Sequence, residues 1–180
     1  IKVLPKLDYS EIVEYLNNNG AVIESYCQVE KYIISYDEST LAIKLSDFNK
    51  LRAMLGYNEI ELKNNEFTTQ WHNAASDEVV NDYVVKNSNL NINGITYNIS
   101  QDSSYKDSIG EGFYSNSDNI IILPDRVCDN LDFIETNFVA NIENKMKYEE
   151  ANEFRQNYIY EWFRNNNSKF VTKYSNENDI

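Results

Sequence analysis

Apolar residues follow a helical period at the start of the chain and a strand-like pattern directly after it. Within 8–16, apolar side chains form one stripe, and Asp8 and Glu11 stand at the spacing of a helix start. From 21–36, β-branched and aromatic residues dominate. These patterns predict a first helix, followed by one long strand or by two strands separated by a bend.

Two further helices are predicted from their end signals. Ser46 can cap a helix start, and Gly56 supplies the residue that commonly follows a helix end. Ser76 precedes an apolar pattern within 73–89 that fits a helix better than a strand. Strands are expected at 41–45, at 60–62 and at 66–71, with a turn at Asn64 and Asn65 before the last of them.

The second half of the chain contains the strongest turn signal. Asn93-Gly94 separates two short alternating segments, and this dipeptide suits the positive φ angles of a type I′ turn, so 90–100 predicts a β-hairpin. Pro124 ends a fully apolar segment at 120–123 that predicts a buried strand. A short helix at 125–131, a strand at 133–142 and a long amphipathic helix at 148–164 complete the expected elements.

Mixed strands and helices without a repeated βα order indicate an α+β fold, with a mixed, largely antiparallel sheet or sheets and about four helices. The length of 180 residues suits one domain, and no Pro- or Gly-rich linker divides it. We therefore expect a single domain over 1–180. Two lobes that share a core remain an alternative, one formed by about 1–72 with 132–180 and the other by 73–131.

The formal net charge of −13 narrows the classes of partner. Such a surface repels nucleic-acid phosphates and anionic lipid, and it attracts cationic peptides or basic protein faces. The acidic residues are spread along the chain, so solubility alone also accounts for them. We expect no nucleic-acid partner, and no membrane contact except through segments outside this chain.

Reactive residue types are scarce. His72 is the only histidine, so a serine or cysteine catalytic site would have to be built on it, and a structural role is favoured. Cys27 and Cys128 form either one long-range disulfide or two buried free residues, and the second is favoured. Tetrahedral zinc sites usually need three or four protein ligands. We therefore predict no catalytic, cofactor-binding or metal-binding residues.

The segment 100–119 is rich in Ser, Asp, Gly and Asn and has no apolar period, which predicts an exposed loop. It carries four large apolar side chains, Tyr105, Ile109, Phe113 and Tyr114. Large apolar groups on such a loop often mark a contact surface, so these four are the candidate partner contacts. The alternative is that they pack back onto the domain.

Several runs resemble a known family. They are Leu45-Ser46-Asp47-Phe48-Asn49-Lys50-Leu51-Arg52, Leu55-Gly56, Ile60-Glu61-Leu62-Lys63-Asn64-Asn65-Glu66, and Ile120-Ile121-Ile122-Leu123-Pro124-Asp125. Over about 41–135, their order resembles the external domains of FtsX-like ABC transporter permeases of Gram-positive bacteria, of the MacB and bacitracin-exporter type. These runs are structural signals, and no functional residue carries over from them.

The resemblance implies a non-catalytic domain on the extracellular face of the cell membrane. It would recognise a peptide antibiotic, a lipid-linked cell-wall precursor or a partner such as a sensor kinase, and it would couple that event to membrane helices. The ATPase would be a separate subunit.

The chain begins at Ile1 and holds no apolar run of membrane-spanning length, so we expect it to be part of a longer protein with flanking spans. That hypothesis predicts chain ends close together on one face. A stand-alone secreted or lipoprotein binding module and an enzyme with a cleft around carboxylates or His72 are the two other hypotheses.

Overall fold

A computed structural model describes residues 10–19, 22–35, 40–100, 105–109 and 119–142, together with the single positions 153 and 157. In chain order the elements are α1 (Ser10–Asn18), β1 (Ile23–Ser35), β2 (Thr40–Lys44), α2 (Leu45–Met54), β3 (Glu66–Trp71), α3 (Asp77–Lys86), β4 (Asn89–Ile92), β5 (Ile95–Ile99), β6 (Asn119–Leu123), α4 (Asp125–Cys128) and β7 (Asp132–Ile142). Both chain ends and nearly all of the helix expected at 148–164 lie outside the described residues.

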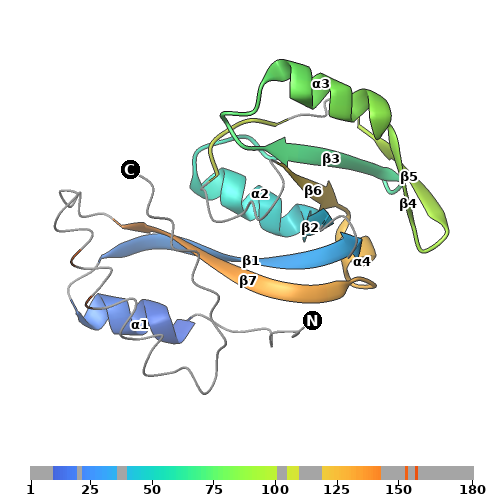
Figure 1. The fold of residues 1–180 in the computed structure, drawn as a ribbon. Coiled ribbons are helices and arrows are strands. Elements are labelled where there is room, and N and C mark those ends of the chain that lie inside the picture. The colour runs from blue at the N-terminus through green and yellow to red at the C-terminus, as the bar shows by residue number, and fades with distance from the viewer. Residues whose placement is uncertain are drawn as a thin grey trace.

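The seven strands form one mixed sheet in the order β4-β5-β3-β6-β2-β1-β7 (Figure 1). Four neighbouring pairs are antiparallel, and β2–β6 and β3–β5 are parallel. The predicted α+β fold with a largely antiparallel sheet is confirmed, and the described residues contain four helices. Because β6 lies between β3 and β2, the described strands of 73–131 belong to the same sheet as those before and after this segment.

Strand β6 divides the hydrophobic core between the two faces of the sheet. Ile120 and Ile122 belong to the cluster that packs under α2, and Ile121 and Leu123 belong to the cluster on the opposite face. The second cluster is covered by α4 and by side chains of the β4–β5 hairpin. Successive strand residues point to opposite faces, so a continuous apolar run such as this one requires cover on both sides.

Three local predictions from turn and cap residues are confirmed. Asn93 and Gly94 have φ angles of 52° and 81°, as the predicted β4–β5 turn requires. The hydroxyl of Ser76 accepts a hydrogen bond from the Val79 amide at the start of α3. Gly56, just beyond the end of α2, has a φ of 84°. In each case, residues adjacent in the sequence are sufficient to specify the backbone.

Replacing Gly94 by alanine is expected to lower the free energy of unfolding by about 1–2 kcal/mol. At positive φ the Cβ atom of an L residue lies too close to the backbone carbonyl oxygen. No atom lies within 4 Å of the added Cβ, so overlap with neighbours does not contribute. Urea unfolding measures the effect. Gly94→Asn is the matched control and should recover most of the loss, since asparagine tolerates this region better. Equal losses in the two variants would contradict this explanation.

Two local predictions are wrong, and long-range hydrogen bonds explain both. Ser46 is not the cap of α2, because the helix begins at Leu45; the amide of Ser46 donates instead to Asp125 Oδ1 over 3.0 Å. The strand expected at 60–62 is absent, because the side chain of Asn49 bonds both the amide and the carbonyl of Ile60, each over 2.9 Å. A helix side chain therefore takes the place of a neighbouring strand.

Candidate functional site

A hollow of about 790 Å³ opens between β1 and α2. It is lined by Ser25, Tyr26, Cys27, Gln28, Glu30, Lys44, Ser46, Asp47, Lys50, Ala53, Met54, Glu59 and Asp125. Four consecutive β1 residues, 25–28, belong to this lining, although successive strand side chains point to opposite faces of a sheet. The hollow therefore runs along the edge of β1 and not over one face. We call it the β1–α2 groove.

The different lengths of β1 and β2 create this groove. In the described part of the chain, β2 pairs with β1 only at residues 31–35. On its other side, β1 pairs with β7 from Ile23 to Ile33. Figure 1 shows the long β1–β7 ribbon extending beyond β2, with α2 lying above it. The N-terminal part of β1 consequently faces the side of a helix where a strand would otherwise continue.

Two hydrogen bonds fix α2 relative to the β1–β7 ladder. Near its start, Asp47 Oδ2 accepts from the Glu30 amide over 3.3 Å. At its end, the Met54 carbonyl accepts from Asn141 Nδ2 over 3.0 Å. Asn141 lies opposite Ser25 in the β1–β7 pairing, so this bond is near the far end of the groove. Both walls of the groove thus belong to one hydrogen-bonded unit.

The groove is acidic overall. Its charged side chains are the carboxylates Glu30, Asp47, Glu59 and Asp125 and the amines Lys44 and Lys50. Four carboxylates against two amines leave a formal excess of two negative charges. Lys44 also forms an ion pair of 2.8 Å with Asp129, and this hydrogen bond raises the Lys44 pKa. Burial raises the pKa of Asp47, against the opposing effect of its bond from the Glu30 amide.

The two cysteines are free and buried, as favoured from the sequence. They belong to different hydrophobic clusters. Burial raises the pKa of Cys27, which lines the groove, to about 11, and that of Cys128 to about 12. Because the thiolate is the nucleophile, both side chains are unreactive near neutral pH.

Two of the four predicted loop contacts, Tyr105 and Ile109, lie among the described residues. Ile109 is 2% exposed and belongs to the core under α2, so its assignment as an exposed contact is wrong. Tyr105 is half-buried and contacts the Phe48 ring edge-on at 6.2 Å between centroids. Its backbone bonds Thr69 and Trp71 of β3. These two side chains pack back onto the domain, whereas Phe113 and Tyr114 lie outside the described residues.

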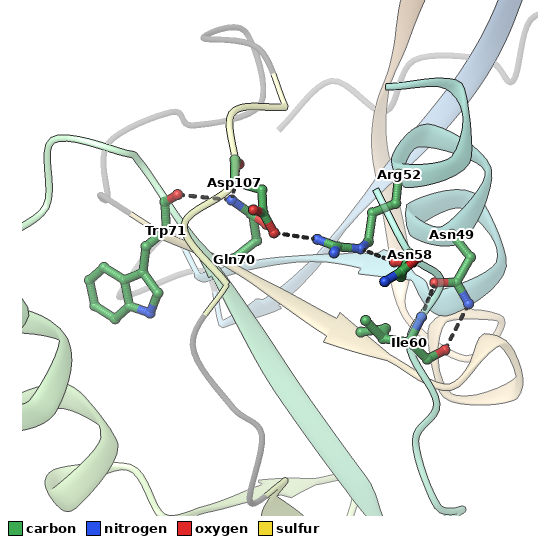
Figure 2. Close-up of polar contacts among 7 residues, drawn as sticks. All are labelled: Asn49, Arg52, Asn58, Ile60, Gln70, Trp71 and Asp107. Atoms are coloured by element: carbon green, nitrogen blue, oxygen red, sulfur yellow. Dashed lines mark hydrogen bonds and ion pairs between the residues drawn. The ribbon is translucent and has the colours of Figure 1, made fainter. Parts of the chain in front are cut away.

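Arg52 of α2 anchors this part of the chain, although it is not among the contact residues predicted from the sequence. It is 5% exposed, and it donates to Asp107 Oδ2 over 2.8 Å and to the Asn58 carbonyl over 2.6 Å. Figure 2 shows the guanidinium between these two acceptors. The Tyr105 ring lies 4.9 Å from the guanidinium carbon, and the rings of Phe48 and Tyr57 lie within 6 Å. We call these contacts the Arg52 clamp.

Gln70 holds the same loop from the sheet. It is buried in β3, and its Nε2 donates to the carbonyls of Trp71 and Asp107 over 2.9 and 2.8 Å (Figure 2). Residues 105–109 are therefore bonded to both α2 and β3. A signal for the clamp exists in the sequence: Arg52 follows Phe48 by four residues, which places a cation on the apolar side of a helix.

His72 follows β3, and its Nδ1 accepts a hydrogen bond from the Ala74 amide over 3.1 Å, which stabilises the turn after the strand. Within the described ranges, no three His, Cys, Asp or Glu side chains gather closely enough to bind a metal ion. In the same part of the chain, no helix has the length and apolar character needed to cross a membrane.

Comparisons with protein-family models, curated proteins and solved structures found no match to this chain. The geometry of the β1–α2 groove and the resemblance in the sequence are therefore the two grounds on which its function can be proposed.

Proposed function

We propose that this chain is the non-catalytic extracellular domain of an FtsX-like ABC transporter permease, and that it contacts its ligand or partner through the β1–α2 groove. The observation that carries the proposal is the groove itself: a large, acidic hollow between a strand edge and a helix fixed at both ends. Its volume lies in the range of about 300–1,000 Å³ common for ligand sites. The resemblance over 41–135 supports the class of protein.

The negative charge of the groove favours some of the partners that the family resemblance implies over others. A cationic peptide antibiotic or a basic face of a sensor kinase gains from the two excess negative charges, whereas the phosphate groups of a lipid-linked cell-wall precursor are repelled. Attraction of this kind mainly raises the rate of encounter, and it is screened beyond about 8 Å at physiological salt. A positively charged ligand is therefore favoured.

Helix α2 offers a route for coupling. One side of it lines the groove through Asp47 and Lys50, and Arg52 on the same helix holds residues 105–109. A ligand that displaced α2 would alter both sets of contacts, and packed elements move as units because interiors are close-packed. In the proposed permease, such a displacement would pass to the membrane helices, and the separate ATPase subunit would respond on the cytoplasmic side.

Cysteine labelling tests the proposed location. Val85 on α3 is 78% exposed, so a Val85→Cys variant presents a reactive thiol, whereas Cys27 and Cys128 are buried. In intact cells producing the full-length protein, a membrane-impermeant maleimide should label Val85→Cys and leave the parent protein almost unlabelled. The protein should also remain in carbonate-washed membranes.

Labelling only after cell lysis would contradict the extracellular location. A labelled protein that left the membranes during the carbonate wash would contradict the permease assignment and favour the secreted binding module. The same Val85→Cys variant labelled in lysed cells shows that the thiol is reactive.

A further inference from the structure

We infer that the β1–α2 groove receives an extended, basic peptide segment that lies beside β1 as an additional strand. This inference rests on the proposed function, in which the groove is the contact site. It specifies the extended conformation of the ligand, its main-chain contact with the edge of β1 and the pattern of its side chains.

The backbone direction of β1 supports strand addition. The Glu30 amide points towards α2, since it donates to Asp47. The pairing with β7 is regular from Ser25 to Lys31, and in a regular strand the backbone groups of alternate residues point to the same side. The amide and carbonyl of Tyr26 therefore face the groove. Extended peptides bind sheet edges through such main-chain groups.

The dimensions suit a short peptide. The consecutive lining residues Ser25–Gln28 of β1 precede Glu30, whose amide is bonded to Asp47. At about 3.3 Å per residue they extend over roughly 10–13 Å, the length of about four extended residues. Opposite them, the span from Ser46 to Met54 on α2 covers about 12 Å at 1.5 Å per residue. A second strand fits between these walls in length, with its two ends emerging beyond the helix.

The side chains around the groove specify the peptide pattern. An extended peptide directs alternate residues to opposite sides. Basic residues at every second position can approach Asp47 and Glu59, and apolar residues between them can contact Tyr26, which is 42% exposed and packs on Phe138 with ring centroids 5.7 Å apart. The groove therefore favours alternating basic and apolar residues.

Fluorescence anisotropy tests this with the 180-residue chain and a labelled peptide of eight residues in which lysine and valine alternate. We expect saturable binding, and at least tenfold weaker binding of the peptide with glutamate in place of lysine. Two further peptides keep the lysines but carry N-methyl groups on alternate backbone nitrogens, one on the lysine nitrogens and the other on the valine nitrogens. The peptide whose methylated nitrogens face β1 should bind about tenfold more weakly, because those hydrogen bonds are lost.

The double variant Asp47→Asn, Glu59→Gln should weaken lysine-peptide binding five- to tenfold. Asparagine at 47 keeps an oxygen that can accept from the Glu30 amide, so α2 should stay in place. The matched control is Glu78→Gln, Asp82→Asn on α3, which removes the same charge away from the groove and should change binding less than twofold.

Each outcome decides a separate point. If both N-methylated registers bound as well as the parent peptide, strand addition would be overturned and a charged contact site would remain. If the two double variants weakened binding equally, or if no peptide bound, the groove would not be the site. Binding of vesicles that carry a polyprenyl pyrophosphate, in the absence of peptide binding, would overturn the basic ligand. The extracellular location is tested independently by the labelling experiment.

Discussion

Replacing Arg52 by alanine is expected to lower the free energy of unfolding by about 2–4 kcal/mol, because it removes a buried side chain and leaves the Asp107 carboxylate and the Asn58 carbonyl without their donor. The guanidinium bonds Asp107 and the Asn58 carbonyl, and three aromatic rings surround it. Alanine removes all of these contacts and leaves a cavity beside the core residue Phe48. Urea unfolding followed by tryptophan fluorescence measures the loss.

Two further variants separate the causes. Arg52→Lys keeps the charge but lacks the planar fork, so it should recover only part of the stability. Arg126→Ala is the matched control: Arg126 also donates to a backbone carbonyl, that of Asn64, over 2.6 Å, but it is exposed. Its loss should stay below about 1 kcal/mol. Equal losses at positions 52 and 126 would show that the Arg52 clamp is not a major source of stability.

The elements that could be predicted from the sequence are those specified by adjacent residues. The Asn93-Gly94 turn requires only two residues that tolerate positive φ, and the start of α3 requires only the Ser76 hydroxyl. Strand β6 was evident because four consecutive apolar residues before Pro124 demand cover on both faces. Elements specified by such local signals can be predicted before the order of the strands in the sheet is known.

The errors arose where distant residues determine the local structure. Ile60 has the sequence of a strand, but the side chain of Asn49 occupies its backbone groups. Ile109 lies in a polar segment, yet the bonds that Asp107 makes with Arg52 and Gln70 hold that segment against the domain, where Ile109 is buried. Neither the Asn49–Ile60 bonds nor the Asp107 bonds follow a sequence spacing from which they could be predicted.

The candidate site could not be predicted for the same reason. The β1–α2 groove exists because β2 is shorter than β1 and pairs only with its C-terminal part. Its acidic residues come from separate elements: Glu30 from β1, Asp47 from α2 and Asp125 from α4. In the sequence they are indistinguishable from the other acidic residues that give this chain its charge of −13. Only the register of the sheet brings them together.

The core under α2 leads to the second large expected effect. Replacing Ile122 by alanine should lower the free energy of unfolding by about 2–5 kcal/mol, through lost burial and the cavity that remains. Ile122 is fully buried, and β6 is hydrogen-bonded to strands on both sides, with Ile43 and Thr68 as its neighbours. The surrounding structure has little freedom to collapse into the space.

Urea unfolding of three variants tests this account. Ile122→Val removes one methyl group and should cost about 0.5–1.5 kcal/mol. Ile95→Ala is the matched control, because Ile95 is also a strand isoleucine but is 56% exposed, and its loss should be within about 1 kcal/mol. A loss at position 122 no greater than that at 95 would mean that β6 is not packed as described. Since β6 joins the β3 side of the sheet to the β2–β1–β7 side, a full loss at 122 would show that burial in this central strand is a major source of the stability of the sheet.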